Sequence, residues 1–165
     1  MAIDLKRKGF AQEVLGVEAE PVNAAAAEKI GLVDRGVSFS ECLEQCDLVG
    51  LAVPVGAAVR MLPQILDGFR AIEEKEGSCT KVVIDVCSTK EHLARSVKYH
   101  PDRCSYVATH PMAGTEYSGP WAAMPGRPCL QHLRQRGIFS EGGKARRTDV
   151  CRPEHEDHIH ELFKS

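Results

Sequence analysis

Three side chains in this sequence follow apolar segments, at positions where they could act on a bound small molecule: Glu18, Ser88 and His110. A carboxylate can accept hydrogen bonds from the ribose hydroxyls of a dinucleotide. A serine hydroxyl can orient a polar ligand, and a neutral imidazole can accept a proton or a hydrogen bond near pH 7. Simpler roles stay open: Glu18 as a solvated strand-end carboxylate, Ser88 as a helix N-cap, and His110 as a loop residue bonded to backbone.

These residues need secondary-structure elements that bring them to one edge of the fold. Strands are predicted where apolar residues run together, over 13–18, 47–54, 82–86 and 105–109. Helices are predicted over 2–8, 21–30, 40–46, 55–76 and 89–97, the fourth being long and amphipathic with a kink at Pro63. This alternation predicts an α/β fold, an open, mostly parallel sheet with helices on both faces. Ligands of such sheets bind beyond the carboxyl ends of the strands, where all three candidates lie.

The start of the chain suggests that this Rossmann-like fold is incomplete. The first predicted strand already ends in the acidic residue, Glu18, and the glycine-rich loop of a dinucleotide-binding fold lies about 20 residues before that position. Such a loop would fall before Met1. We therefore expect the first strand and the glycine loop to be missing, and we hypothesise that Met1 is an internal methionine of a longer protein.

Composition excludes several classes of protein. The 165 residues are 43% hydrophobic and 27% charged, as in globular domains. The formal net charge of −2 provides no field that would attract nucleic acid or an anionic membrane. No segment approaches the roughly 18 apolar residues of a membrane span, and the early charges are unlike a signal peptide. Seven widely spaced cysteines argue against a disulfide framework, so we expect a cytoplasmic protein with reduced thiols and no nucleic-acid or membrane partner.

The string Ala-Thr-His-Pro-Met-Ala-Gly-Thr-Glu-Tyr-Ser-Gly at 108–119 resembles the prephenate dehydrogenases of tyrosine biosynthesis. The turn Asp-Val-Cys-Ser-Thr-Lys at 85–90 and the segment Leu-Ala-Val-Pro-Val at 51–55 carry the same resemblance. It implies a partial dinucleotide-binding domain over 1–126. Residues 127–165 depart from the family pattern, and we expect a divergent, poorly ordered tail that is read out of frame. Hydroxyacid and imine dehydrogenases share the fold but lack the His-Pro-Met string.

The resemblance implies oxidative decarboxylation of prephenate to 4-hydroxyphenylpyruvate. His110 would accept the hydrogen bond from the C4 hydroxyl of the substrate, Ser88 would orient the same region, and Thr115 would line the substrate and nicotinamide site. We expect structural roles for two other residues of the turn, with Asp85 at the strand end and Lys90 on the surface of the first helical turn. Whether prephenate or arogenate is the substrate is left open.

The same resemblance implies a nicotinamide cofactor. Val53, Pro54 and Val55 would pack near the nicotinamide ribose, while Glu18 favours NAD because its charge would repel the 2′-phosphate of NADP. The full-length family forms homodimers. A fragment without catalysis is the alternative, since a chain lacking the glycine loop loses several hydrogen bonds to the pyrophosphate and would bind the cofactor weakly.

Two further clusters could bind metal or form thiol pairs. The histidines near the C-terminus could bind a transition metal with His132 or Cys151, namely His155, His158 and His160. Their spacing does not place three imidazoles on one helix face, so we expect no metal site. Cys42 and Cys46 lie four apart on a short predicted helix, which fits either core packing or a surface thiol pair, and they do not form a Cys-x-x-Cys redox motif.

Overall fold

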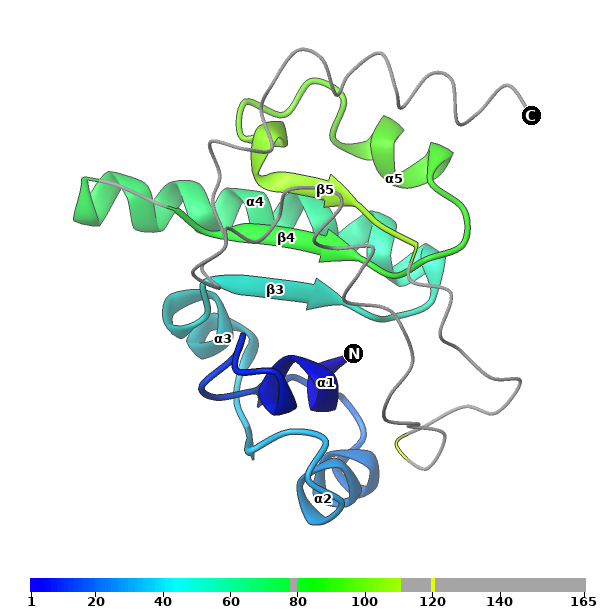
Figure 1. Ribbon diagram of the computed structural model, residues 1–165. Coiled ribbons are helices and arrows are strands. Elements are labelled where there is room, and N and C mark those ends of the chain that lie inside the picture. The colour runs from blue at the N-terminus through cyan, green and yellow to red at the C-terminus, as the bar shows by residue number, and fades with distance from the viewer. Residues whose placement is uncertain (78–79, 111–119, 121–165) are drawn as a thin grey trace.

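The computed structural model describes residues 1–77, 80–110 and 120, in which helices and strands alternate (Figure 1). The helices are α1 (Ala2–Arg7), α2 (Pro21–Lys29), α3 (Phe39–Gln45), α4 (Val55–Glu76) and α5 (Glu91–Ser96), with a 3-10 turn at Arg103–Ser105. The strands are β1 (Leu15–Gly16), β2 (Arg35–Gly36), β3 (Leu48–Leu51), β4 (Val82–Asp85) and β5 (Tyr106–Ala108). All were expected from the sequence except β2 and the 3-10 turn, although several begin or end a few residues away from the predicted positions.

Every strand pairing in the described chain is parallel, and the strands form two sheets. One sheet has the order β1–β2 and the other the order β3–β4–β5. In the larger sheet Leu51 pairs with Asp85, which pairs with Ala108, so the three carboxyl ends lie level with one another. The prediction of a mostly parallel, Rossmann-like sheet is confirmed, with the described strands divided between two sheets.

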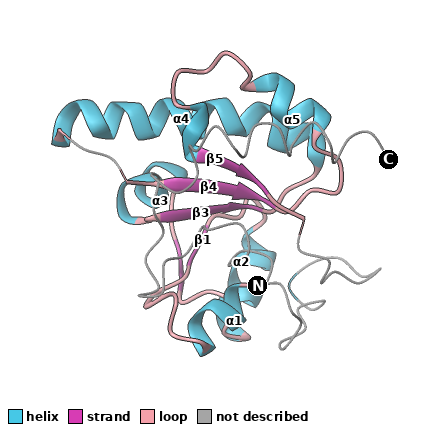
Figure 2. Cartoon of the chain, turned by 45° about the horizontal axis from the view of Figure 1, so that its top comes forward, coloured by secondary structure: helices cyan, strands magenta, loops and turns pink. Residues whose placement is uncertain are grey.

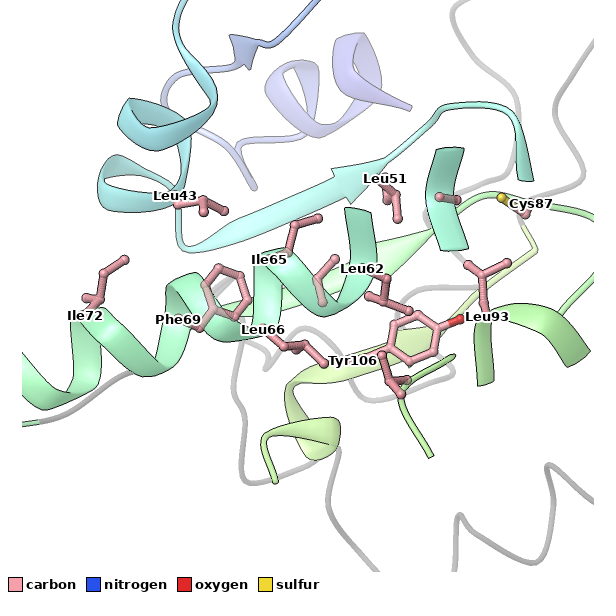
Figure 3. Packing of buried hydrophobic residues seen from close by; sticks show 13 residues of the cluster. Leu43, Leu51, Leu62, Ile65, Leu66, Phe69, Ile72, Cys87, Leu93 and Tyr106 are labelled. Carbon is pink, nitrogen blue, oxygen red and sulfur yellow. The ribbon is translucent and has the colours of Figure 1, made fainter. Parts of the chain in front are cut away.

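Helix α4 covers one face of the larger sheet. Its apolar residues recur at spacings of three and four, and the helix continues through Pro63 to end at Gly77, which adopts φ 78°. Leu62, Ile65 and Leu66 are fully buried. Each such side chain contributes about 1.5–3 kcal/mol when removed from water. Leu93 of α5 belongs to the same cluster, which fills the space between these helices and the sheet (Figure 3).

A second, smaller core cluster lies on the other face of the same sheet. Leu5 of α1 packs there against Val82, Ile84 and Val107, with Phe10 at the margin. Residues of β4 alternate between the two clusters, as the pleat of a strand requires. The larger sheet therefore has helices on both faces, as predicted (Figure 2).

Helix α3 begins earlier than its predicted first residue because Ser38 caps it. The Ser38 hydroxyl accepts a hydrogen bond from the amide of Glu41, which satisfies one of the amides that a helix leaves unpaired at its start. Leu43 then projects from α3 into the core beneath the sheet. Within the described residues, no helix has both the length and the apolar character needed to cross a bilayer.

Candidate active site

The carboxyl ends of β3, β4 and β5 bring three of the predicted segments to one edge. The segment 53–55 follows β3, Ser88 follows β4, and His110 follows β5. The side chains of Ser88 and His110 are both exposed. Because β4 and β5 are adjacent and parallel, these two residues lie at neighbouring strand ends, where open α/β sheets bind their ligands.

The segment at the end of β3 forms the start of helix α4. Pro54 occupies the N-cap position, is exposed, and has an extended backbone conformation with ψ 144°. Val53 and Val55 are half-buried and pack against the core. The segment therefore offers a small apolar surface at the same edge as Ser88 and His110.

A fully buried carboxylate, Asp85, lies at the centre of this edge. Its Oδ2 accepts a hydrogen bond from the hydroxyl of Tyr106 at 2.8 Å. Its Oδ1 accepts from the amide of Cys87 at 2.9 Å and from the ammonium of Lys90. A buried carboxylate needs such donors and a counter-charge, since desolvation otherwise costs several kcal/mol. Asp85 thereby connects β4, β5 and the turn that carries Ser88.

Lys90 closes that turn, which corrects the expectation of a surface lysine. Only 13% of its side chain is exposed, and its ammonium donates to the Cys87 carbonyl at 2.6 Å as well as to Asp85. The buried charge of Asp85 draws the lysine inward. Helix α5 begins only at Glu91, so the expectation that Ser88 caps the helix is wrong. The N-cap position belongs to Lys90, and no side chain caps the helix.

The ends of β3 and β5 are also bonded to β4. The buried hydroxyl of Thr109 donates to the Asp85 carbonyl, immediately before His110. The Cys87 thiol donates to the Val53 carbonyl at 3.8 Å. All three strand ends are therefore held together by contacts of residues next to the candidate site residues.

Two of the groups that contact Asp85, the Tyr106 hydroxyl and the Cys87 thiol, stay protonated and neutral near pH 7. Burial, followed by the charge of Asp85, raises the pKa of Tyr106 well above its ordinary value. Burial and the same charge also raise the pKa of the Cys87 thiol. Both side chains therefore remain hydrogen-bond donors at physiological pH, and the ion pair of Asp85 with Lys90 is the charged centre of the network.

Glu18 lies two residues after the end of β1, which belongs to the smaller sheet. Its side chain is exposed, and its Oε1 accepts a hydrogen bond from the amide of Glu20 at 3.1 Å. An exposed carboxylate at the carboxyl end of a parallel strand fits the acceptor that ribose hydroxyls require.

Three sequence predictions fall outside the described residues. Thr115 lies in the segment 111–119, and both the C-terminal histidine cluster and the predicted divergent tail over 127–165 lie beyond 120. Across 1–77, 80–110 and 120, no three side chains of the His, Cys, Asp and Glu types gather as metal ligands would.

Sequence reasoning assigned no role to Tyr106 or Thr109. A signal for both was present, because each carries a hydroxyl inside or directly after an otherwise apolar strand. Buried hydroxyls require hydrogen-bond partners. No pattern in the sequence indicated that both would bond to the same residue, Asp85.

Comparison with known families matches most of the chain. The family model described as prephenate dehydrogenase, nucleotide-binding domain, matches residues 1–126. A curated prephenate dehydrogenase of Lactococcus lactis subsp. cremoris is 28% identical over 125 residues, covering 74% of this chain and 33% of the relative. One of Bacillus subtilis is 30% identical over 125 residues, covering 74% of this chain and 32% of the relative. The chain thus spans about a third of the length of these relatives.

Solved structures show the same fold. The prephenate dehydrogenase from A. aeolicus in complex with hydroxyphenyl propionate and NAD+ aligns with a TM-score of 0.58 at 22% identity, covering 99% of this chain and 59% of that one. A putative prephenate dehydrogenase from Corynebacterium glutamicum has a TM-score of 0.56 at 28% identity, covering 74% and 36%. An arogenate dehydrogenase from Synechocystis has a TM-score of 0.59 at 18% identity, covering 99% and 51%.

Proposed function

This chain belongs to the prephenate dehydrogenase family, and we propose that it binds NAD and presents His110 and Ser88 to prephenate for oxidative decarboxylation to 4-hydroxyphenylpyruvate. The observation that carries the proposal is the parallel pairing of β4 with β5, which leaves both side chains exposed at adjacent strand ends. The cofactor supplies the hydride acceptor. The step would serve tyrosine biosynthesis.

His110 and Ser88 act on the substrate hydroxyl. The imidazole of His110 accepts the hydrogen bond from the C4 hydroxyl and takes its proton as the ring loses hydride, and general-base assistance of this kind contributes about 10²–10⁴-fold. Ser88 bonds the same region and orients it, which lowers the entropic part of the barrier. Loss of carbon dioxide is driven by aromatisation of the ring. Thr115 lines the same site by the family pattern.

The cofactor half of the site uses the ends of β1 and β3. The exposed carboxylate of Glu18 accepts hydrogen bonds from the ribose hydroxyls, and its negative charge disfavours the 2′-phosphate of NADP. Val53, Pro54 and Val55 supply the apolar surface next to the nicotinamide ribose. The NAD+ found with the A. aeolicus relative supports this cofactor class.

Cofactor binding is tested by titrating the chain with NADH and following the enhancement of its fluorescence. We expect saturation, and weaker binding in Glu18→Gln because the amide is a poorer acceptor for two ribose hydroxyls. Glu20→Gln is the matched control, since it changes an exposed carboxylate two residues away. Absence of saturable binding, or equal loss in both variants, would refute the assigned cofactor site.

Turnover is tested separately, by the absorbance of NADH formed from NAD+ and prephenate. We expect His110→Asn to lower the rate about 10²–10⁴-fold while its NADH affinity stays unchanged. His92→Asn, which alters an exposed histidine of α5, is the control and should keep the wild-type rate. If the wild-type chain binds NADH without forming product, or if His110→Asn turns over normally, the assigned chemistry is wrong although the cofactor site stands.

A further inference from the structure

Two thiols outside the candidate active site face each other at the end of α3. The sulfurs of Cys42 and Cys46 are 3.7 Å apart, which is contact distance for two sulfur atoms. Cys42 is buried in the core and Cys46 is half-buried beside it. The sequence left two interpretations open, core packing or a surface thiol pair. Cys42 packs in the core, whereas Cys46 is partly exposed to solvent.

The ammonium of Lys81 lies at the same end of the helix. It donates to the carbonyls of Glu44 at 2.8 Å and of Cys46 at 2.9 Å. These are carbonyls of the last turn, whose partial negative charge would otherwise disfavour a thiolate there. The positive charge of Lys81 therefore offsets the negative end of the helix and favours a thiolate at this place.

The contact between the two thiols lowers the pKa of one and raises the pKa of the other. The hydrogen bond from Cys46 lowers the pKa of Cys42 to about 7, against the opposing effect of burial and with help from the charge of Lys81. The same contact, together with burial and the charge of Asp47, raises the pKa of Cys46. One thiolate is thus available per pair near neutral pH, and the thiolate is the form that attacks a disulfide.

The backbone at this point tolerates the shift that a sulfur–sulfur bond requires. Residues four apart on a helix are separated by about 6 Å along its axis, which lies within the range of Cα separations bridged by disulfides. Cys46 is the C-cap, with an extended conformation of φ −88° and ψ 137°. Its amide donates to the Cys42 carbonyl at 3.0 Å, and its carbonyl accepts from Lys81, which also bonds the Glu44 carbonyl. Cys46 thus lies just outside the helix, where a small adjustment of the chain changes few of its contacts.

We propose that Cys42 and Cys46 form a reversible disulfide site, with a small disulfide such as oxidised glutathione as the electron acceptor. The Cys42 thiolate attacks one glutathione sulfur, forming a mixed disulfide and releasing one glutathione thiolate. Cys46 then loses its proton to solvent and attacks the sulfur of Cys42, which forms the internal bond and releases the second glutathione. Two electrons pass from the protein thiols to the glutathione disulfide. The site goes beyond the proposed function and uses none of its residues.

Mass spectrometry of the oxidised chain tests the proposal directly. Trypsin cleaves after Arg35 and Arg60 and releases the peptide 36–60, which contains both cysteines and no other. After equilibration of the folded chain with oxidised and reduced glutathione, we expect this peptide to have lost two hydrogen atoms and to regain them with dithiothreitol. Cys46→Ser should instead carry one glutathione on Cys42. Cys104→Ser, the control, should keep the crosslink.

The role of Lys81 gives a second measurement. We expect Lys81→Met to slow crosslinking several-fold at neutral pH, and Lys81→Arg to restore it because the positive charge returns. A peptide 36–60 that stays reduced, or that carries two glutathiones and no crosslink, would overturn the proposal. Equal rates in Lys81→Met and the wild-type chain would refute the assignment of Lys81 as the group that activates the pair.

Discussion

The buried hydroxyl of Tyr106 offers a sharp test of the network that holds the candidate active site. Tyr106→Phe removes one oxygen and leaves the ring, so the packing of the core is preserved. The Oδ2 atom of Asp85 loses the donor at 2.8 Å, while Oδ1 keeps its bonds to Lys90 and to the amide of Cys87. The substitution therefore isolates a single hydrogen bond to a buried carboxylate.

The magnitude follows from the charge of the acceptor. A hydrogen bond to a charged group contributes about 1.5–3 kcal/mol, and a partner left buried without one costs a similar amount. We expect Tyr106→Phe to lower the free energy of unfolding by about 2 kcal/mol at neutral pH. For a chain of this size the midpoint of thermal unfolding should fall by about 4–8 °C. Urea denaturation followed by circular dichroism measures the loss.

The effect also depends on pH in a defined direction. Burial, and then the charge of Asp85, raises the pKa of Tyr106 in the folded chain, whereas an unfolded tyrosine ionises near pH 10. The folded state therefore keeps a proton that the unfolded state releases. The contribution of Tyr106 is complete below about pH 10 and is lost as the pH rises further, so the wild-type chain and Tyr106→Phe should converge in stability there.

The control is Tyr99→Phe, which makes the same chemical change at a tyrosine that is 88% exposed. Surface substitutions of this kind change stability by about 0.5 kcal/mol or less. If Tyr106→Phe were as stable as Tyr99→Phe at neutral pH, and if the difference did not shrink above pH 10, the hydrogen bond to Asp85 would not hold β5 as described.

Three further substitutions test the fold around the site. Asp85→Asn should destabilise the chain by about 3–5 kcal/mol in urea denaturation, because Lys90 is left without its buried counter-charge. The double variant Asp85→Asn with Lys90→Met should recover part of this loss, and strictly additive effects of the two substitutions would contradict a direct ion pair. Gly68→Ala should destabilise the chain by about 1 kcal/mol or more, because a Cβ there would meet Leu43 Cδ1 at 2.6 Å. In a Leu43→Ala background the same substitution should stabilise the helix. If it destabilised the chain in both backgrounds, the close contact of α3 with α4 would be refuted. Ser38→Ala should cost about 1 kcal/mol through loss of the α3 cap, with Ser38→Asp retaining stability, and equal thermal midpoints for all three chains would argue against capping.

Long apolar patterns were sufficient to predict the main elements. Helix α4 has the predicted bounds because its buried stripe repeats over six turns between Pro54 and Gly77, and both of these residues mark helix boundaries in a sequence. Strands β3 and β4 follow from continuous apolar runs. Strand β2, which consists of Arg35 and Gly36, has no such pattern and exists only through its pairing with β1. A two-residue strand of this kind depends on its partner rather than on its own residues.

The order of strands and helices along the sequence was also enough to place Ser88 and His110 at one edge, since parallel strands separated by helices must end on the same side. That order could not determine which side chains hold the strand ends in place. Tyr106 reaches Asp85 because the register pairs Tyr106 with Val83, and Asp85 lies two residues along the same face of β4. Lys90 turns inward because that carboxylate is fully buried and needs a counter-charge. A buried charge is bonded by whichever donors lie within hydrogen-bond distance of it, and these distances depend on how the strands pack rather than on the order of residues in the sequence.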